Sequence, residues 1–83
     1  MVAIGKTVKV LANAAECFRR TKWQRNTGWN WAKEEEEYCG EMGTVITHED
    51  DCGATVKMLG DGSVQEFVFD VLEEVVRPSG VAA

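Results

Sequence analysis

The chain has 83 residues, of which 45% are apolar and 28% charged, a balance that fits one small globular domain and excludes a disordered segment. Its formal net charge of −5 means that a phosphate backbone repels the molecule as a whole, so nucleic acid is not an expected partner. No apolar run approaches the ~20 residues of a membrane-spanning helix, and we expect no membrane association.

Cysteine usage and the first residues of the chain bear on the compartment. The first ten residues lack the long apolar stretch and the small-residue cleavage site of a secretion signal. Three cysteines is an odd number, and their spacing matches no compact disulfide framework. We therefore expect an intracellular protein, cytoplasmic or nuclear, and we expect it to be a monomer.

The first quarter of the chain predicts a strand followed by a helix. Val8 and Val10 alternate with polar residues, which is the pattern of a half-buried strand. Asn13 is followed three residues later by Glu16, and this capping-box pattern predicts a short helix over residues 14–22.

The next elements are a second brief helix and four strands. Asn30 is a candidate cap for a helix over residues 32–38, whose acidic side chains lie near its positive N-terminal end. Apolar alternation then predicts three strands joined by two tight polar turns. A one-turn helix and a closing strand over residues 74–77 complete the chain. The three strands of the meander cover residues 43–48, 54–59 and 63–69.

Glycines define the two turns of this meander. Gly53 is able to adopt a positive φ in the first turn, and Asp61 with Gly62 predicts a type I′ hairpin in the second. In the strand that follows, we expect Phe67 and Phe69 to face the core, because they offer the largest burial.

Five short strands in this order predict a mainly β fold, a small five-stranded SH3-like barrel. Closure into a barrel removes exposed sheet edges, which a chain of this size could not otherwise protect. The long first loop, between the first two strands, is expected to contain one or two short helices. We expect a single domain over residues 1–78 and a flexible C-terminal tail over residues 79–83.

The residues that could perform chemistry do not form a catalytic or metal-binding pattern. Cys17, Cys39, His48 and Cys52 supply the atoms of a Cys₃His zinc site, but structural zinc sites use two close pairs of ligands, and only His48 and Cys52 are close. Nucleophilic catalysis needs a base beside a nucleophile, and the acidic residues that follow the single histidine disfavour a reactive thiolate there. We therefore expect no metal, no cofactor and no enzymatic activity.

Aromatic and charged side chains cluster in the long loop. Three tryptophans within nine residues exceed what the packing of a small core requires, and tryptophan is a frequent hot-spot residue in peptide recognition. The basic residues at 19–25 could hold an acidic ligand, and the glutamates at 34–37 could attract one that bears Lys or Arg. We expect a ligand-binding surface that joins the long loop to the acidic turn at residues 49–51. Its candidate residues are Trp23, Trp29, Trp31, Tyr38, Arg19, Arg20, Glu35 and Asp50.

Together these features resemble the repeat of the Mind bomb ubiquitin ligases, which is also found in the plant Keep-on-going ligase. The likeness runs from about Gly5 to Val76. The matching features are Val8–Leu11, a tryptophan at position 29 or 31, "YCGEMGTV" at 38–45, "EDDCGATVKM" at 49–58, Asp61 with Gly62, Phe67 with Phe69, and "LEEVV" at 72–76. The resemblance implies an SH3-like barrel that is a non-catalytic adaptor or scaffold module. Such repeats hold short segments of a protein partner, while separate domains transfer ubiquitin.

Other functions remain open. Trp29, Trp31, Tyr38 and the glutamate run have the composition of an aromatic cage, which would make the domain a Tudor-like reader of methylated lysine or arginine. The Arg/Trp loop could instead stack on bases and contact phosphates, as in an RNA-binding small barrel, although the net charge opposes this. The chain is also compatible with a piece of a larger scaffold that has no ligand of its own.

Overall fold

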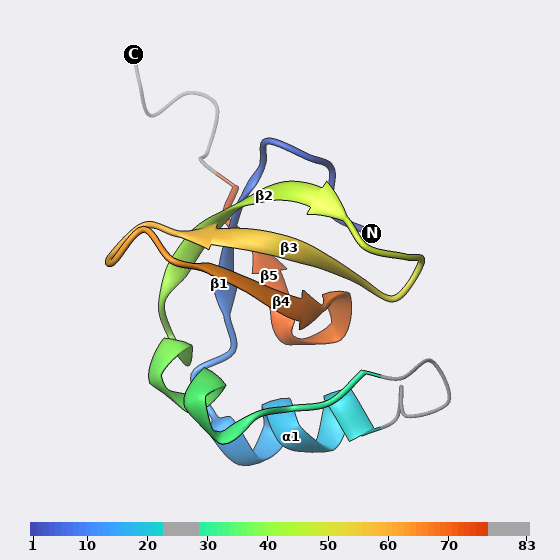
Figure 1. The fold of residues 1–83 in the computed structure, drawn as a ribbon, viewed down its shortest axis with the longest axis vertical. Helices are drawn as coiled ribbons and strands as arrows, with labels where there is room; N and C mark the ends of the chain where they lie inside the picture. Colours follow the sequence, from blue (N-terminus) through green and yellow to red (C-terminus); the bar gives the residue numbers. More distant parts are fainter. Residues whose placement is uncertain (23–28, 77–83) are drawn as a thin grey trace.

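A computed structural model describes residues 1–22 and 29–76 of the protein. The predicted mainly β fold is confirmed, because five antiparallel strands form one sheet in the order β4-β3-β2-β1-β5. The strands are β1 Thr7–Val10, β2 Met42–His48, β3 Gly53–Met58, β4 Val64–Val68 and β5 Leu72–Glu74. The helices are α1 Ala14–Lys22 and two 3₁₀-helices, η2 Lys33–Tyr38 and η3 Phe69–Val71. The sheet faces α1, and the segment that leads into η2 runs between them (Figure 1).

The first strand and α1 form as the sequence predicts. Val8 and Val10 are fully buried in β1. Asn13 caps α1, because its Oδ1 accepts a hydrogen bond of 3.0 Å from the backbone N–H of Glu16. The Glu16 carboxylate is bound by Arg19 and Arg20. α1 therefore has the predicted Asn13 cap, and the Glu16 side chain forms ion pairs with arginines one turn further along the helix.

The second helix begins later than predicted and is a 3₁₀-helix. Ala32 occupies the N-cap position of η2, whereas Asn30 was the predicted candidate for the cap of this helix. The Glu35 side chain provides the capping contact, since its Oε1 accepts a hydrogen bond of 3.0 Å from the N–H of Ala32. The Glu35 N–H donates in turn to Ala32 O (3.0 Å), which is the i→i+3 spacing of a 3₁₀ turn.

The turn between β3 and β4 differs from the type I′ prediction. Gly62 has a φ of 72°, and its N–H donates to Met58 O (3.0 Å). A type I′ turn also needs a positive φ at Asp61, and no described residue other than glycine has one. The connection is therefore a four-residue loop over residues 59–62, which places Met58 opposite Ser63.

From Phe67 onwards, buried and exposed side chains alternate less regularly than the sequence predicts. Phe67 is buried as predicted, at 1% exposure, but Phe69 is only partly buried because η3 begins there and ends the alternation. The Phe69 ring meets the His48 ring edge-on, with centroids 5.5 Å apart. The closing strand β5 begins at Leu72, two residues before the predicted start, because Leu72 joins the core opposite Val10.

The core lies between the sheet, α1 and η3. Its buried apolar members are Val8, Val10, Cys17, Val45, Ala54, Val56, Met58, Phe67, Val68, Val71 and Leu72. Burial raises the pKa of the Cys17 thiol to about 12, with Cys39 as a further cause. Cys17 therefore behaves as a small apolar residue in this core.

The sheet is open in the described part of the chain. β4 and β5 are its two outer strands, and no ladder joins them within residues 1–22 and 29–76. The closed barrel is thus not established by the strand pairing. The predicted domain boundary at residue 78 and the predicted tail at 79–83 lie outside the described residues. None of the described helices has the length and apolar character needed to cross a membrane.

Candidate binding groove

Trp29 is fixed against the turn between β2 and β3. Its Nε1–H donates to Asp50 Oδ2 at 3.0 Å. Asp50 Oδ1 accepts from the backbone N–H groups of Cys52 (2.7 Å) and Gly53 (3.2 Å). These bonds lower the pKa of the Asp50 carboxyl, with the Cys52 N–H as the largest cause and Trp29 next. The structure therefore brings the predicted Trp29 and Asp50 together, and each holds the other in place.

Position 53 requires a glycine because the Trp29 indole approaches its backbone closely. The φ of Gly53 is not positive, so the turn does not use the conformational freedom of glycine. A Cβ atom at this position would lie 2.6 Å from Cη2 and Cζ2 of Trp29 and 2.6 Å from Phe67 O. The absence of a side chain at Gly53 thus lets the Trp29 ring lie on the first residue of β3.

Trp31 packs against the core beside β4. Its ring centroid lies 6.1 Å from that of Phe67, and the planes are tilted by 42°. Its Nε1 atom is buried and has no hydrogen-bond partner among the described residues. Trp29 and Trp31 are both partly buried, whereas Trp23 lies outside the described residues. The two described tryptophans therefore position the loop on the sheet.

Tyr38 joins η2 to the loop between β3 and β4. Its hydroxyl donates to Asp61 Oδ2 (3.0 Å) and accepts from Gln65 Nε2 (3.2 Å), and Ser63 Oγ lies 3.0 Å from it. The pKa of the Asp61 carboxyl is lowered, chiefly by the side chain and backbone of Ser63 and less by Tyr38. Through Tyr38, η2 is held on the same side of β4 as Gln65.

Glu35 points a carboxylate oxygen into a buried position. Its Oε1 accepts the Ala32 N–H, but its Oε2 is buried without a hydrogen-bond partner in the described part of the chain. Burial raises the pKa of Glu35, the Ala32 N–H opposes that shift, and the negative charges of Glu66 and Glu34 raise the pKa further. A buried acceptor without a partner is costly, so this oxygen is ready to accept a donor.

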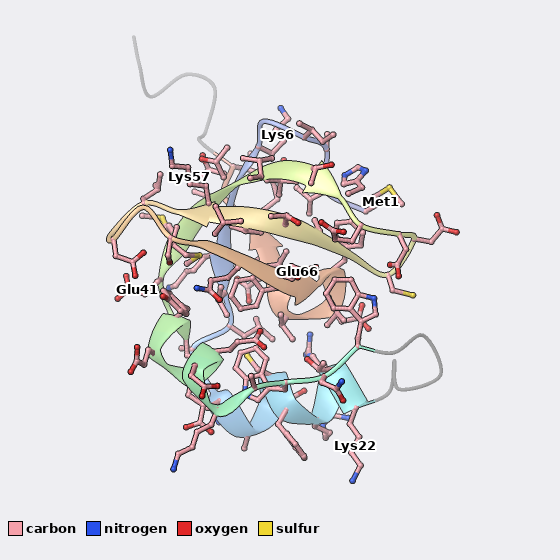
Figure 2. All side chains as sticks on the ribbon, viewed as in Figure 1. Met1, Lys6, Lys22, Glu41, Lys57 and Glu66 are labelled. Carbon is pink, nitrogen blue, oxygen red and sulfur yellow. The ribbon has the colours of Figure 1, made fainter. Side chains whose placement is uncertain are left out.

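A hollow of about 480 Å³ opens beside Glu35, along β4. Side chains from η2, from the turn after β2, from β3 and from β4 form its walls. Figure 2 shows Glu66 on the outer strand β4, while Lys22 extends from α1 away from the sheet. The lining residues are Glu35, Glu49, Thr55, Val64, Gln65 and Glu66. We call this hollow the β4 groove.

The β4 groove is negatively charged, and its glutamates lack a cationic partner among residues 1–22 and 29–76. Glu35, Glu49 and Glu66 form no ion pair with any Lys or Arg that the structure describes. Glu49 accepts a hydrogen bond from the Thr55 hydroxyl, which holds its carboxylate beside the groove. Three carboxylates that are unpaired in the described part of the chain create a local potential that attracts a positive group.

The basic residues of the predicted site lie elsewhere, on α1. Arg19 and Arg20 both bind Glu16, and Arg20 Nη1 also donates to Asp70 O at 2.9 Å. The two guanidinium groups lower the pKa of Glu16 to about 2. Arg20 therefore ties α1 to η3, and neither arginine lines the β4 groove.

The described residues also form two hollows that are smaller than the β4 groove. One, of about 250 Å³, is lined by Phe18, Lys22, Trp29, Asn30 and Trp31. The other, of about 200 Å³, is lined by Glu37, Tyr38, Glu41, Met58, Gly60 and Asp61. The aromatic residues proposed for a methyl-lysine cage are thus divided, because Tyr38 lies in a different hollow from the tryptophans.

The sequence matches no protein-family model and no curated protein. Of the predicted site residues that the structure describes, only Glu35 lines the β4 groove. Thr55, Val64, Gln65 and Glu66 also line the groove, and the sequence had predicted them only as parts of strands. The available signal was Glu66 itself, a charged residue that alternates with Val64 and Val68 along one face of a short strand.

Proposed function

We propose that the protein is a non-catalytic interaction module that binds a positively charged segment of a protein partner in the β4 groove. The observation on which this proposal rests is the set of three groove carboxylates, Glu35, Glu49 and Glu66, with no internal cation in the described structure. Charge complementarity at an exposed groove speeds encounter with a cationic partner and selects against acidic ones.

We further propose that the fold is an SH3-like barrel of the Mind bomb repeat type. The strand order β4-β3-β2-β1-β5 and the one-turn η3 between β4 and β5 support this assignment, because both are features of such barrels. The long first loop, with α1 and η2, supports it as well. On this proposal the domain holds a partner segment for other domains to act on.

The state of the nucleophiles supports a binding function over catalysis. Burial holds the Cys17 thiol protonated, and its Sγ contacts Leu11 O at 3.5 Å. His48 Nε2 lies 2.6 Å from Val2 O, and its ring packs edge-on against Phe69. Both groups have structural contacts that compete with catalysis. The three free cysteines support the proposal of an intracellular site, cytoplasmic or nuclear.

The test is a titration of the isotopically labelled protein with short peptides that differ only in charge. We expect an arginine-containing peptide to shift the amide signals of Glu35, Glu49 and Glu66, and we expect its glutamate counterpart to leave them unchanged. The triple variant E35Q/E49Q/E66Q should weaken binding at least about tenfold. A matched control, E73Q/E74Q, removes charge from β5 at the other end of the sheet. Equal binding by the two variants would contradict the proposal.

A methyl-lysine reader remains a second candidate because three aromatic rings line the hollow beside α1. The ammonium of Lys22 already lies 5.7 Å from the Phe18 ring centroid there, so an internal cation occupies one aromatic face. Trimethylated and unmethylated lysine peptides separate the two candidates in the same titration. A cage prefers the methylated peptide and shifts the Trp29 and Trp31 indole signals, whereas the β4 groove shows neither effect.

A further inference from the structure

The ladder between β3 and β4 shows which backbone groups of β4 are used. Met58 N–H donates to Ser63 O at 2.8 Å, and Phe69 N–H donates to Cys52 O at 2.8 Å. In an antiparallel pair, residues that bond to the neighbouring strand alternate with residues whose N–H and C=O point away from it. Every second residue from Ser63 to Phe69 therefore bonds to β3.

Val64 and Glu66 have the opposite orientation. Their N–H and C=O groups point away from β3, and β4 is the last strand of the described sheet. No backbone hydrogen bond to either residue from outside the β3–β4 ladder occurs in residues 1–22 and 29–76. Both side chains are exposed, with Val64 at 54%. This short edge can pair with a further strand.

The β4 groove runs along this same edge. Gln65 points to the side of β4 that faces Tyr38 and η2, and Val64 and Glu66 point to the opposite side. Because residues of both orientations line the groove, the groove contains the free backbone edge.

The carboxylates lie on both sides of that edge. Glu35 belongs to η2 and therefore lies on the Gln65 side. Glu66 is paired across the ladder with Thr55, whose hydroxyl binds Glu49, so these two glutamates lie on the other side. Charged residues on an edge strand discourage pairing with neutral or acidic strands, and here they favour a basic one.

We propose that a basic segment of a protein partner binds as an added β-strand on β4, an inference that rests on the proposed function. The backbone of the segment bonds to the outward N–H and C=O groups of Val64 and Glu66. Successive side chains of a strand point to opposite faces, so two adjacent basic residues place one cation beside Glu35 and the next beside Glu49 and Glu66. The recognised feature is therefore an extended segment with two consecutive Lys or Arg residues.

The probe is the peptide acetyl-Thr-Val-Arg-Arg-Val-Thr-amide, added to the labelled 83-residue protein. At saturation, the amide protons of Val64 and Glu66 should exchange with solvent at least about tenfold more slowly than in the free protein. Two N-methylated versions of the probe are compared. Each version is methylated on every second backbone amide, and the two versions carry the methyl groups on opposite sets of amides. One version should bind at least about tenfold more weakly and the other within about twofold, because only one set of amides faces β4. Equal affinities would overturn strand addition.

A variant of the protein tests the same edge. Val64→Pro removes an outward N–H without removing a bond to β3, and edge strands tolerate proline at such positions. The matched control is Glu74→Pro on β5, where the N–H also points away from the sheet, since Val75 N–H donates to Thr7 O. We expect V64P to bind the probe at least about tenfold more weakly and E74P within about twofold. The N-methylated peptides decide the question if V64P does not fold.

The outcomes separate this inference from the proposed function. Strand addition would be overturned if the probe shifted the signals of Glu35, Glu49 and Glu66 but did not slow amide exchange at Val64 and Glu66, and if V64P bound the probe as well as the native protein does. The proposal of a cation-binding groove would survive that result. If the probe at about 1 mM shifted none of these signals, both the inference and the proposed function would be overturned.

Discussion

At the scale of single residues, Gly53 is the position where the loop and the sheet depend on each other. The Trp29 indole lies where a Cβ of residue 53 would be, and the carbonyl of Phe67 lies equally close. Neither a ring held by Asp50 nor a backbone oxygen can move aside easily. The position of the Trp29 ring therefore depends on the absence of a side chain at Gly53.

The substitution G53A should destabilise the fold by about 1–3 kcal/mol, because the added methyl group forces Trp29 or β4 to shift. Urea unfolding followed by tryptophan fluorescence measures the change. The matched control is G60A, where an added Cβ has no atom within 4 Å and φ is not positive. This control should change stability by less than about 1 kcal/mol. Equal losses in the two variants would mean that Trp29 does not rest on Gly53.

Glu35 gives a residue-scale prediction for pH. Burial raises its pKa above the ordinary 4.5, so the folded protein holds this proton more tightly than the unfolded chain does. The contribution of Glu35 to stability is complete below pH 4.5 and is lost as the pH rises through the raised pKa. The lowered pKa values of Asp50 and Asp61 act in the opposite direction, but both groups are present in any Glu35 variant and cancel in a comparison.

The variant E35Q should therefore gain stability relative to the native protein as the pH rises from about 4 to about 7. Gln keeps an oxygen that can accept the Ala32 N–H, so the cap of η2 is retained. Denaturant titrations at a series of pH values give the difference in the free energy of unfolding. A difference that stays constant across this range would show that Glu35 is not perturbed by its surroundings.

At the scale of elements, α1 depends on a cap that local sequence specifies. Asn13→Ala removes the acceptor for the Glu16 N–H and should lower the free energy of unfolding by about 1 kcal/mol. Asn13→Asp keeps an oxygen in the same place and should stay close to the native value. Thermal unfolding followed by circular dichroism compares the three proteins. Loss of stability in both variants would point to an effect other than capping.

Elements with strong local signals were predictable from the sequence, and the candidate site was not. α1 has its cap and β1 its alternation, and both were found in place. The β4 groove combines residues from η2, the β2–β3 turn and two strands, and their adjacency depends on contacts such as the bond from Tyr38 to Asp61. The loop between β3 and β4 was mispredicted because Asp-Gly fits more than one turn type, and hydrogen bonding to Met58 selects the longer loop.

At the scale of the whole molecule, the proposed function implies that the charge of the β4 groove favours ligand binding at the expense of the stability of the free protein. The protein carries a net charge of −5, and its described ion pairs lie on α1, away from the β4 groove. The groove carboxylates repel one another in the free protein, and a bound cation relieves that repulsion. Sites of this kind commonly reduce stability, because the arrangement that suits the ligand is unfavourable without it.

The triple variant E35Q/E49Q/E66Q should consequently unfold at a higher temperature than the native protein while it loses affinity for basic peptides. The gain in Tm should be largest at low ionic strength and should shrink as NaCl rises towards about 1 M, where the screening length falls to about 3 Å. The variant E73Q/E74Q removes charge of the same sign from β5 and should gain less, because its side chains are exposed and line none of the described hollows. Calorimetry at several salt concentrations compares the three proteins. If the triple variant were less stable at low salt, the three glutamates would be part of the scaffold, and the assignment of a binding function to the β4 groove would fail with them.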